Sequence, residues 1–340
     1  MKFLFRILKV FRSSLAILPV LLSLCGCSGG SQQQDVIVIK FPHVTAPATP
    51  KGQSAERFRQ LVEQRLGGRV KVEVYPSGQL MNDDDAIDSL AFGEVQMIAP
   101  ALSKFDRLTK KFQIYDLPFL LPDIQSVEKF QSSPAGKSLL NVIEDRGILG
   151  LAIWHNGMKQ FGAPVPMRRP ADADGLKFRI MESDVLEAQI LQIGGNPQKM
   201  AFGEVYQALQ TGAVDAQENT WSNMYSQKFY EVQDYLIETN HAYLGYLVAV
   251  NPAFWRSLPE EIRSELEKIL AEVTRWNNEQ AVAINQADRQ KIIESGQTEI
   301  VKLTPDEIRE WQAVMRPVWE KFEDNIGAET IQAALAASRE

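Results

Sequence analysis

From residue 36 onward, short apolar runs alternate with amphipathic stretches along the chain. The run VIVIKF (36–41) predicts a buried strand. The segment SAERFRQLVEQRLGG (54–68) has apolar residues near helical spacing and ends at a glycine pair, and RVKVEVY (69–75) alternates as a half-buried strand does. Strand, helix and strand in this order predict a βαβ unit, which joins an α/β sheet through a right-handed crossover.

The same rhythm continues and then begins a second time. The runs MIAPAL (97–102) and ILGLAIW (148–154) extend the first set of elements. The strand-like LKFRI (176–180) opens a second set, which continues through a helix over 202–212 and a short run at 214–219. At about 150 residues per domain, 340 residues suggest one large domain or two lobes.

A nearly unbroken helical pattern follows from residue 259 to residue 295. At a rise of about 1.5 Å per residue, such a helix is about 55 Å long, which exceeds the width of a lobe of ~130 residues. It must therefore cross from one lobe to another, kink or project. Thr304 and Pro305 then begin another helix with a capping box, and its aromatic residues favour core packing over a ligand-binding role.

The first residues have the layout of an export signal. Residues 1–14 carry four Lys or Arg and no acid, and residues 15–24 form an apolar run too short to span a membrane. The stretch Leu-Cys-Gly-Cys (24–27) resembles a bacterial lipobox, which predicts lipidation of Cys27; a plain signal peptide cut nearby is the alternative. Residues 28–34 are typical of a flexible tether. Several acyl chains together would give stable membrane anchoring.

Composition and charge narrow the class of protein. With 45% hydrophobic and 23% charged residues, the chain is neither disordered nor collagen-like. The net charge is −7, and loss of the four leader cations leaves 32 basic against 43 acidic residues, a net charge of −11. Nucleic-acid binding is therefore not expected, because it needs a basic surface. The two cysteines, Cys25 and Cys27, leave the body of the chain without a disulfide or a cysteine-based metal site.

Motifs of catalysis are missing from the sequence. It contains no GxGxxG, GxxxxGK[ST], HExxH or GxSxG. His43, His155 and His241 share no metal-like spacing, so a zinc site is not predicted. The triplet Asp83–Asp85 is either a cation cluster or, as we favour, a solvated helix start. A carboxylate pair for hydrolysis stays open, although no spacing favours one.

Two cations lie at the edges of predicted elements. Arg179, near the end of a predicted strand, could fork onto a carboxylate, since ligands of open α/β sheets bind beyond the carboxyl ends of strands. Lys51 falls in the first turn after Thr49, where free backbone N–H groups favour an anion. For each residue taken alone, an ordinary exposed cation is the simpler interpretation.

A long block and several ordered segments carry a family resemblance. The block GGNPQKMAFGEVYQALQTGAVDAQENTWSNMYSQKFYEVQDYLIETNH (194–241) is similar to the central region of TRAP (tripartite ATP-independent periplasmic) transporter solute receptors, and among these the chain resembles the dicarboxylate type. The resemblance covers almost everything from Val36 to the C-terminus. The supporting segments are VEVYPSGQL (72–80), YDLPFLLPD (115–123), WHNGMKQF (154–161), GLKFRI (175–180) and NPAFWRSLPEEIR (251–263).

The resemblance implies a fold and an activity. It implies an α/β, two-lobed fold of the periplasmic-binding-protein kind, with a hinge and a long helix that crosses both lobes. The activity implied is capture of a solute between the lobes and its delivery to TRAP permease subunits in the membrane, without catalysis, cofactor or metal. A four-carbon dicarboxylate such as succinate, fumarate or malate is the expected solute. A receptor-fold lipoprotein that reports to a signalling partner and an exported hydrolase are the alternatives.

The resemblance also assigns site residues. It implies that Arg179 forms an ion pair with a solute carboxylate and that Asn219 and Phe202 line the site. Ala216 and Thr220 stand where the family usually has Gly and Pro, which alters the expected backbone near Asn219.

A second solute carboxylate needs a second set of donors. Lys159, at the basic position of the N-G-x-[KR] segment, is one candidate, and Lys51 and His43 are the others. Trp154, which opens the same motif, is also placed in the site. Arginine offers a planar fork that lysine does not reproduce, so we expect Arg179 to be the principal anchor.

The expected organisation follows from these points. We expect a monomer in the periplasm or on the outer face of the envelope, held to a membrane by its lipid anchor alone. The predicted parts are a signal peptide (1–26), a tether (27–35), lobe I (36–155, with parts of 245–340), lobe II (156–244), the long helix (258–296) and C-terminal helices (304–340).

Overall fold

The computed structural model describes residues 36–339. The predicted signal peptide, the tether and the lipidation of Cys27 lie outside these residues. Among the residues that the structure describes, no helix has both the length and the apolar character needed to cross a membrane. The body from Val36 onward is one compact unit, and all that follows concerns this unit.

The first lobe is built on five strands. β1 and β2 pair in parallel in the register Ile37↔Val70, with α1 between them in sequence, which confirms the predicted βαβ unit. β10 is the middle strand of an antiparallel sheet of order β3-β10-β4, and every residue of β10 is buried, as expected for the centre of a core. The bounds are β1 (Ile37–Pro42), α1 (Pro50–Leu66), β2 (Val70–Tyr75), β3 (Met97–Ile98), β4 (Leu149–Met158) and β10 (Tyr243–Val250).

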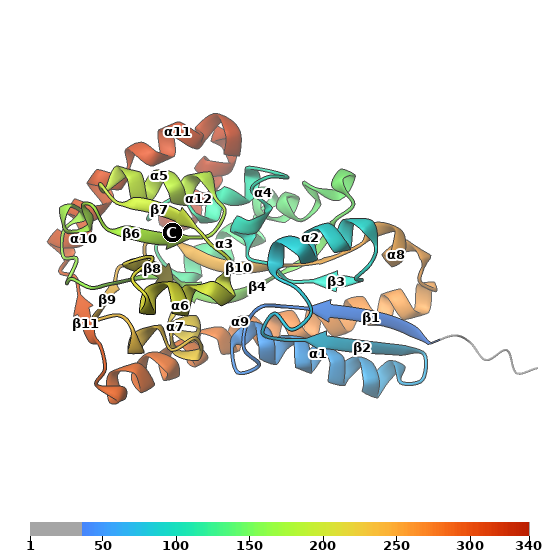
Figure 1. The fold of residues 1–340 in the computed structure, drawn as a ribbon. Coiled ribbons are helices and arrows are strands. Elements are labelled where there is room, and N and C mark those ends of the chain that lie inside the picture. The colour runs from blue at the N-terminus through green and yellow to red at the C-terminus, as the bar shows by residue number, and fades with distance from the viewer. Residues whose placement is uncertain (1–35, 340) are drawn as a thin grey trace, which may run out of the picture. The chain divides into compact units, whose positions relative to one another are not determined.

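The second lobe is built on a six-stranded mixed sheet of order β11-β9-β5-β8-β6-β7. β6 pairs in parallel with both β7 and β8, whereas β5 runs antiparallel to β8 and β9. In Figure 1 the strands of this sheet lie on the left and β1 to β3 on the right. The bounds are β5 (Gln160–Ala163), β6 (Lys177–Ile180), β7 (Asn196–Lys199), β8 (Ala216–Asn219), β9 (Tyr235–Glu238) and β11 (Glu299–Lys302).

The chain crosses between the two lobes at adjacent points. Lys159 is the single residue between β4 and β5, and residues 239–242 link β9 to β10. The N–H of Lys159 donates to the carbonyl of Ala242 across a distance of 2.7 Å, which ties the two crossings together. This pair of linked crossings is the hinge of the fold.

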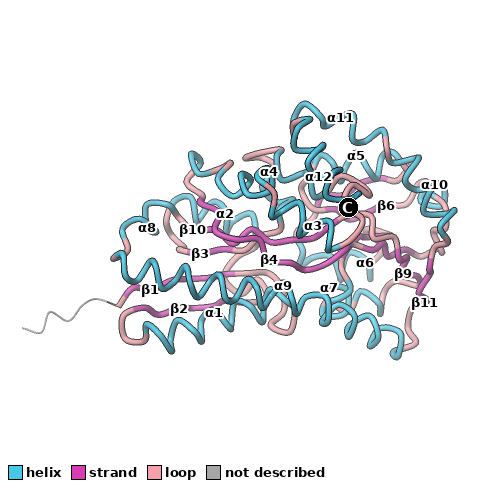
Figure 2. The backbone as a smooth tube through the Cα atoms, turned by 180° about the vertical axis from the view of Figure 1, so that it is seen from behind, coloured by secondary structure: helices cyan, strands magenta, loops and turns pink. Residues whose placement is uncertain are grey.

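The long helix α9 (Glu260–Ser295) crosses both lobes. It packs against α1 and β4 of the first lobe and against α7 (Trp221–Ser226) of the second, as Figure 2 shows from behind. Of the three options that the sequence left open for a helix of this length, crossing is the one observed. Buried apolar residues such as Leu266 and Val273 hold its first half, and buried polar residues such as Asn285 hold its second.

Shorter helices cover the sheets. α11 contacts α5 of the second lobe while α12 contacts α3 and α4 of the first, so the C-terminal helices span both lobes. Trp311 on α10 is fully buried in the core, as predicted for the aromatic residues of this segment. The remaining α-helices are α2 (Asp83–Phe92), α3 (Ile124–Ser132), α4 (Pro134–Ser138), α5 (Asp184–Gln192), α6 (Val205–Gln210), α8 (Pro252–Ser257), α10 (Pro305–Met315), α11 (Pro317–Ile326) and α12 (Ala328–Arg339).

Candidate functional site

A small cavity lies where the two lobes meet. Its volume is about 30 Å³, room for about two water molecules. A hollow of about 270 Å³ shares Val44, Asp83, Lys104 and Phe202 with it and extends it outward. The residues that line this inter-lobe cavity are Val44, Thr45, Asp83, Ala101, Lys104, Leu244 and Tyr246 from the first lobe, and Arg179, Met181, Phe202, Asn219 and Asn223 from the second.

Arg179 is the principal cation of the second-lobe wall. It lies on β6, is only 1% exposed, and donates from Nε and Nη2 to the carbonyl of Met200 at 3.1 and 2.8 Å. The other N–H groups of its guanidinium bind no acceptor among the described residues. Burial lowers the pKa of Arg179 to about 10, which still leaves it charged at neutral pH. The side chain therefore offers an anchored cation with free donors to the cavity.

The amide and hydroxyl groups of the cavity are held so that they present donors. Asn219 Oδ1 accepts from the N–H of Thr220 at 3.0 Å and from Asn223 Nδ2 at 2.8 Å, which leaves its own NH₂ group to donate. The hydroxyl of Tyr246 accepts from Asn156 at 2.7 Å and from Asn223 at 3.3 Å. Burial raises the pKa of Tyr246, so its O–H proton stays in place and can also be donated.

A buried chain of side chains supports these groups from behind. Asn156 on β4 accepts from the hydroxyl of Ser222 at 2.8 Å, and its backbone carbonyl accepts from Asn285 on α9 at 2.7 Å. The side chain of Asn285 also lies 3.2 Å from where a Cβ on Gly157 would be, so a larger residue there would push this side chain away by a few tenths of an ångström. The long helix thus holds the donors of the cavity in position through Asn156.

Lys104 is the cation of the first-lobe wall. It lies in the 3₁₀ turn that follows β3, is 5% exposed, and has its Nζ 2.6 Å from Asp84 Oδ2. Lys104 lines both the inter-lobe cavity and the outer hollow. Sequence reasoning missed this residue, although its position just beyond a buried strand was a usable signal. Arg179 and Lys104 therefore provide one cation from each lobe.

The structure brings some predicted site residues together and places others elsewhere. Arg179, Asn219 and Phe202 all line the inter-lobe cavity. Lys51 does not: its Nζ donates to the carbonyl of Ala99 at 3.0 Å and lies 3.9 Å from the ring centre of Tyr246, so it supports the cavity wall from behind. Trp154 is buried in the core, where its indole N–H donates to Thr274 at 3.0 Å.

His43 is buried beside the cavity rather than on its wall. Its Nδ1 lies 3.3 Å from the hydroxyl of Thr45, which does line the cavity. Burial and the nearby charge of Lys51 lower the pKa of His43 to about 3. It is therefore neutral at physiological pH and supplies no positive charge to an anion.

Lys159 lies at the hinge and not on the cavity wall. Its fully buried Nζ lies 3.2 Å from Asp116 Oδ1 and 3.0 Å from Glu218 Oε2, and His241 Nε2 lies 3.4 Å from the same Glu218 oxygen. We call Asp116, Lys159, Glu218 and His241 the hinge cluster. Burial raises the pKa of Glu218, but Lys159 and His241 outweigh it and hold that pKa below its ordinary value. The cation of Lys159 is thus already paired with protein carboxylates.

The other chemical candidates from the sequence have simpler roles. Asn82 caps α2 by accepting from the N–H groups of Asp84 and Asp85, both at 2.9 Å, so the triplet begins a helix as we favoured, but Asp83 is buried at 8% exposure rather than solvated. Across residues 36–339, no three His, Cys, Asp or Glu side chains cluster in a way that could hold a metal ion.

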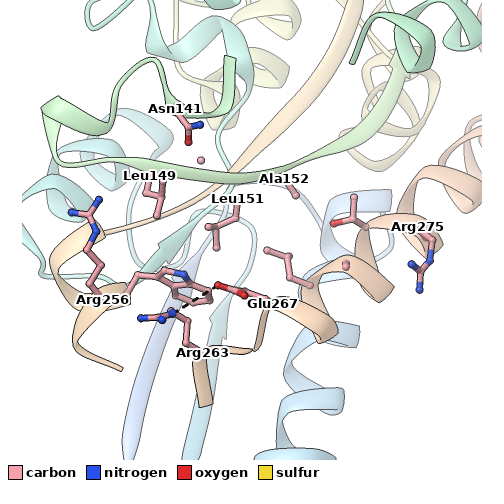
Figure 3. Close-up of a pocket in the computed structure, with 13 residues that line it drawn as sticks. Asn141, Leu149, Leu151, Ala152, Arg256, Arg263, Glu267 and Arg275 are labelled. Atoms are coloured by element: carbon pink, nitrogen blue, oxygen red, sulfur yellow. Dashed lines mark ion pairs between the residues drawn. The ribbon is translucent and has the colours of Figure 1, made fainter. Parts of the chain in front are cut away.

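A larger groove of about 820 Å³ lies elsewhere, between β4, α8 and α9. Figure 3 shows its apolar floor of Leu149 and Leu151 and its three arginines. Arg256 pairs with Glu144, and the Nε of Arg263 lies 4.0 Å from Glu267. The groove shares no residue with the inter-lobe cavity, and both apolar and charged side chains line it.

A donor-rich cavity between two hinged α/β lobes defines a solute receptor of the periplasmic-binding class. The profile of bacterial extracellular solute-binding protein family 7 matches residues 41–325, and the chain belongs to this family. The two-lobed fold and the resemblance to TRAP solute receptors of the dicarboxylate type, both expected from the sequence, are confirmed by the comparisons that follow.

Two relatives in sequence are named as dicarboxylate-binding proteins. The C4-dicarboxylate-binding periplasmic protein DctP of Shewanella loihica is 49% identical over 300 residues, which are 88% of this chain and 89% of that protein. The C4-dicarboxylate-binding protein DctB of Bacillus subtilis is 39% identical over 303 residues, 89% of this chain and 87% of that protein.

A solved structure extends the similarity to three dimensions. A TRAP periplasmic solute-binding protein from Shewanella oneidensis, solved with bound succinate, has a TM-score of 0.88 and 49% identity. The match covers 89% of this chain and all of that one.

Proposed function

We propose that the protein captures a four-carbon dicarboxylate between the lobes, in the inter-lobe cavity together with the hollow of about 270 Å³ that extends it, and delivers it to the membrane subunits of a TRAP permease. The observation that carries this proposal is the pair of buried cations, Arg179 and Lys104, on opposite lobes of one cavity in which Asn219 and Tyr246 are held as donors. A carboxylate removed from water needs charge-assisted hydrogen bonds, which such a cavity supplies.

The placement of the two cations also suggests how binding closes the lobes. A dicarboxylate that reaches Arg179 at one end and Lys104 at the other links the lobes, whereas a monocarboxylate engages one of them. A ligand shifts an equilibrium toward the state that it binds better, so a bridging dianion favours the closed form. The bound succinate of the Shewanella oneidensis structure and the names of the relatives support a solute of this size.

Calorimetric titration of the purified protein tests the proposal. We expect tight binding of succinate, L-malate or fumarate, and binding at least about tenfold weaker for butyrate, which keeps the carbon chain but has a single carboxylate. The solute should be recovered unchanged after long incubation, since we propose no catalysis. Failure of every four-carbon dicarboxylate to bind would refute the proposed function.

We also propose that the protein is a lipoprotein of the cell envelope, attached through Cys27. This proposal stands on the sequence alone, from the basic leader, the short apolar run and the lipobox-like stretch. Mass spectrometry of the isolated protein should find a lipid-modified N-terminal cysteine. Cys27→Ser should release the protein from the membrane without changing solute affinity. An unmodified N-terminus downstream of Cys27 would refute the anchor and leave the receptor function untouched.

A further inference from the structure

Asp83 is a carboxylate on the wall of a cavity that otherwise presents donors. It is the first residue of α2, is 8% exposed, and lines both the inter-lobe cavity and the outer hollow together with Lys104. No hydrogen bond or ion pair within the described residues involves its carboxylate oxygens. Lys104, a cation that lines the same cavity, is paired with the neighbouring Asp84. An acid so placed is unexpected in a site for anions and calls for a role.

We propose that Asp83 takes up a proton when a dicarboxylate binds and then donates a hydrogen bond to the ligand. Asp83 would thereby determine how strongly the receptor prefers dianions at a given pH. The inference rests on the proposed function, because it concerns the same cavity and the same class of ligand.

The charges around Asp83 explain why uptake would accompany binding. In the ligand-free cavity, Arg179 and Lys104 offset the negative charge of Asp83. A dicarboxylate brings two further negative charges into the same small space and engages those cations. Two carboxylates that share a buried site do not both stay ionised, and a proton between them converts repulsion into a hydrogen bond. Burial raises the pKa of Asp83 already, while Lys51 and Lys104 oppose this shift.

Of the other titratable groups near Asp83, Lys51 also changes charge near neutral pH, since burial lowers its pKa to about 8, and proton uptake retained in Asp83→Asn would assign the proton to Lys51 instead. The titratable groups on the elements around Asp83 are His43 after β1, Lys51 on α1, Asp84 on α2, Lys104 after β3, Arg179 on β6, Glu204 on the rim of the outer hollow and Tyr246 on β10. The pKa of His43 is about 3 and that of Tyr246 is raised by burial, so both keep one protonation state near neutral pH. Asp84 Oδ2 forms an ion pair with Lys104 Nζ at 2.6 Å.

The sign of the pH dependence follows by linkage. A ligand that raises the pKa of a site binds more tightly as the pH falls, and the slope equals the number of protons taken up. Uptake of one proton gives a change in Kd of up to about tenfold per pH unit. Around pH 7 and above, the carboxylates of the solute itself are already ionised, so they contribute little to the slope.

Calorimetry in buffers of different ionisation enthalpy measures the uptake directly. Succinate is titrated into the purified protein at about pH 7 in phosphate, imidazole and Tris, and the slope of the observed enthalpy against the buffer enthalpy gives the proton count. We expect the wild type to take up at least about 0.3 proton per ligand and Asp83→Asn to take up almost none. Asp83→Asn should also bind succinate at about pH 8.5 at least as tightly as the wild type, because its amide donates without a charge.

Two controls make the result specific. Asp85→Asn changes an exposed acid of the same helix and should keep the wild-type proton count. If Asp83→Asn does not fold, as judged by its melting curve, Asp83→Ser serves as the second variant, with the same expected loss of uptake.

The outcomes separate the inference from the function on which it rests. Binding of succinate by the wild type with less than about 0.3 proton taken up, as expected if Asp83 stays charged beside its cations, would overturn the inference alone. So would wild-type uptake in a folded Asp83 variant. Absence of succinate binding by the wild type would overturn the proposed function, and this inference with it.

Discussion

Two buried sets of charges lie near the junction of the lobes, and they differ in how far their hydrogen-bonding capacity is used. In the hinge cluster, Lys159 has a carboxylate oxygen on each of two residues within 3.2 Å, and Asp116 also accepts from the hydroxyls of Ser103 and Ser183 at 2.8 and 2.9 Å. In the inter-lobe cavity, Arg179 has one backbone carbonyl as its acceptor among the described residues, and Lys104 has one carboxylate oxygen, on Asp84.

This difference in saturation separates a structural cluster from a binding site. A buried charge without partners is costly, so a fold retains one only where something else compensates it. The hinge cluster compensates itself, and it does so across both lobes, since Ser103 belongs to the first lobe and Ser183 to the second. The cavity leaves donors open, which is what recognition of an anion requires. Degree of burial alone does not separate the two, because both sets are almost fully buried.

The largest effect that we predict comes from removing the cation of the hinge cluster. Lys159→Met leaves Asp116 and Glu218 buried without their cation, which should lower the free energy of unfolding by about 3–5 kcal/mol. Chemical denaturation measures this loss. Adding Glu218→Gln to Lys159→Met should recover part of the lost stability, because one uncompensated charge is removed. A single variant as stable as the wild type would contradict the self-compensated hinge cluster.

A substitution in the inter-lobe cavity should have the opposite effect: it should weaken solute binding and leave the free energy of unfolding unchanged. Arg179→Lys retains the charge but not the planar fork, and should weaken succinate binding by about 2 kcal/mol or more, at least about thirtyfold in Kd. Lys177→Met, on the same strand but at the surface, is the matched control and should bind normally. Titration calorimetry measures the succinate Kd of both variants. Unchanged binding by Arg179→Lys would remove Arg179 as the anchor of the site.

The comparison also shows what could be predicted from the sequence. The βαβ unit and the long helix follow from periodicity, because burial on one face fixes which residues are apolar. Arg179, Asn219 and Phe202 were identified through contiguous motifs, and all three lie on the cavity wall.

The roles of the other charged residues near the site depend on contacts between segments that are distant in sequence. The partners of Lys159 lie 43 and 59 residues away, so no local pattern shows that this cation is already paired. Asp83 belongs to a triplet that begins a helix, and only the tertiary arrangement, in which α2 packs against β3, places this acid on the wall of the inter-lobe cavity. Lys104 is one of four cations between residues 104 and 111, and only its position soon after a buried strand sets it apart. In each case the pairing, rather than the residue type, decides the role.

Lys104, the other cation of the inter-lobe cavity, should contribute less to solute affinity than Arg179. Lys104→Met removes the first-lobe cation and should cost about 1.5–3 kcal/mol of succinate binding, about ten- to hundredfold in Kd, as for one charged hydrogen-bonding group. Butyrate, which we expect to use Arg179 alone, should lose much less. Titrations with both acids give the ratio of the two losses. Equal losses would show that Lys104 does not meet the second carboxylate.

The last effect, which is small for each pH unit, concerns a buried polar group that belongs neither to the hinge cluster nor to the inter-lobe cavity. His155 is fully buried, and burial lowers its pKa to about 4 from an ordinary value of 6.5. The unfolded chain therefore binds a proton below pH 6.5 that the folded protein does not bind until about pH 4. Stability is fully present above the ordinary pKa and falls as the pH drops through this window, by about 1.4 kcal/mol per pH unit.

His155→Gln isolates this contribution. The amide can keep a hydrogen bond with Gln131, whose Oε1 lies 3.1 Å from His155 Nε2, but it does not titrate. Urea denaturation at several pH values between about 4.5 and 6.5 should give a shallower loss of stability for the variant than for the wild type, by about 1.4 kcal/mol per pH unit. His43, with a pKa near 3, and His241, whose pKa burial also lowers, act with the same sign, so part of the slope should remain in His155→Gln. Identical slopes for His155→Gln and the wild type would mean that His155 is charged in the folded protein, and that a buried charge can persist here without the partners that the hinge cluster supplies.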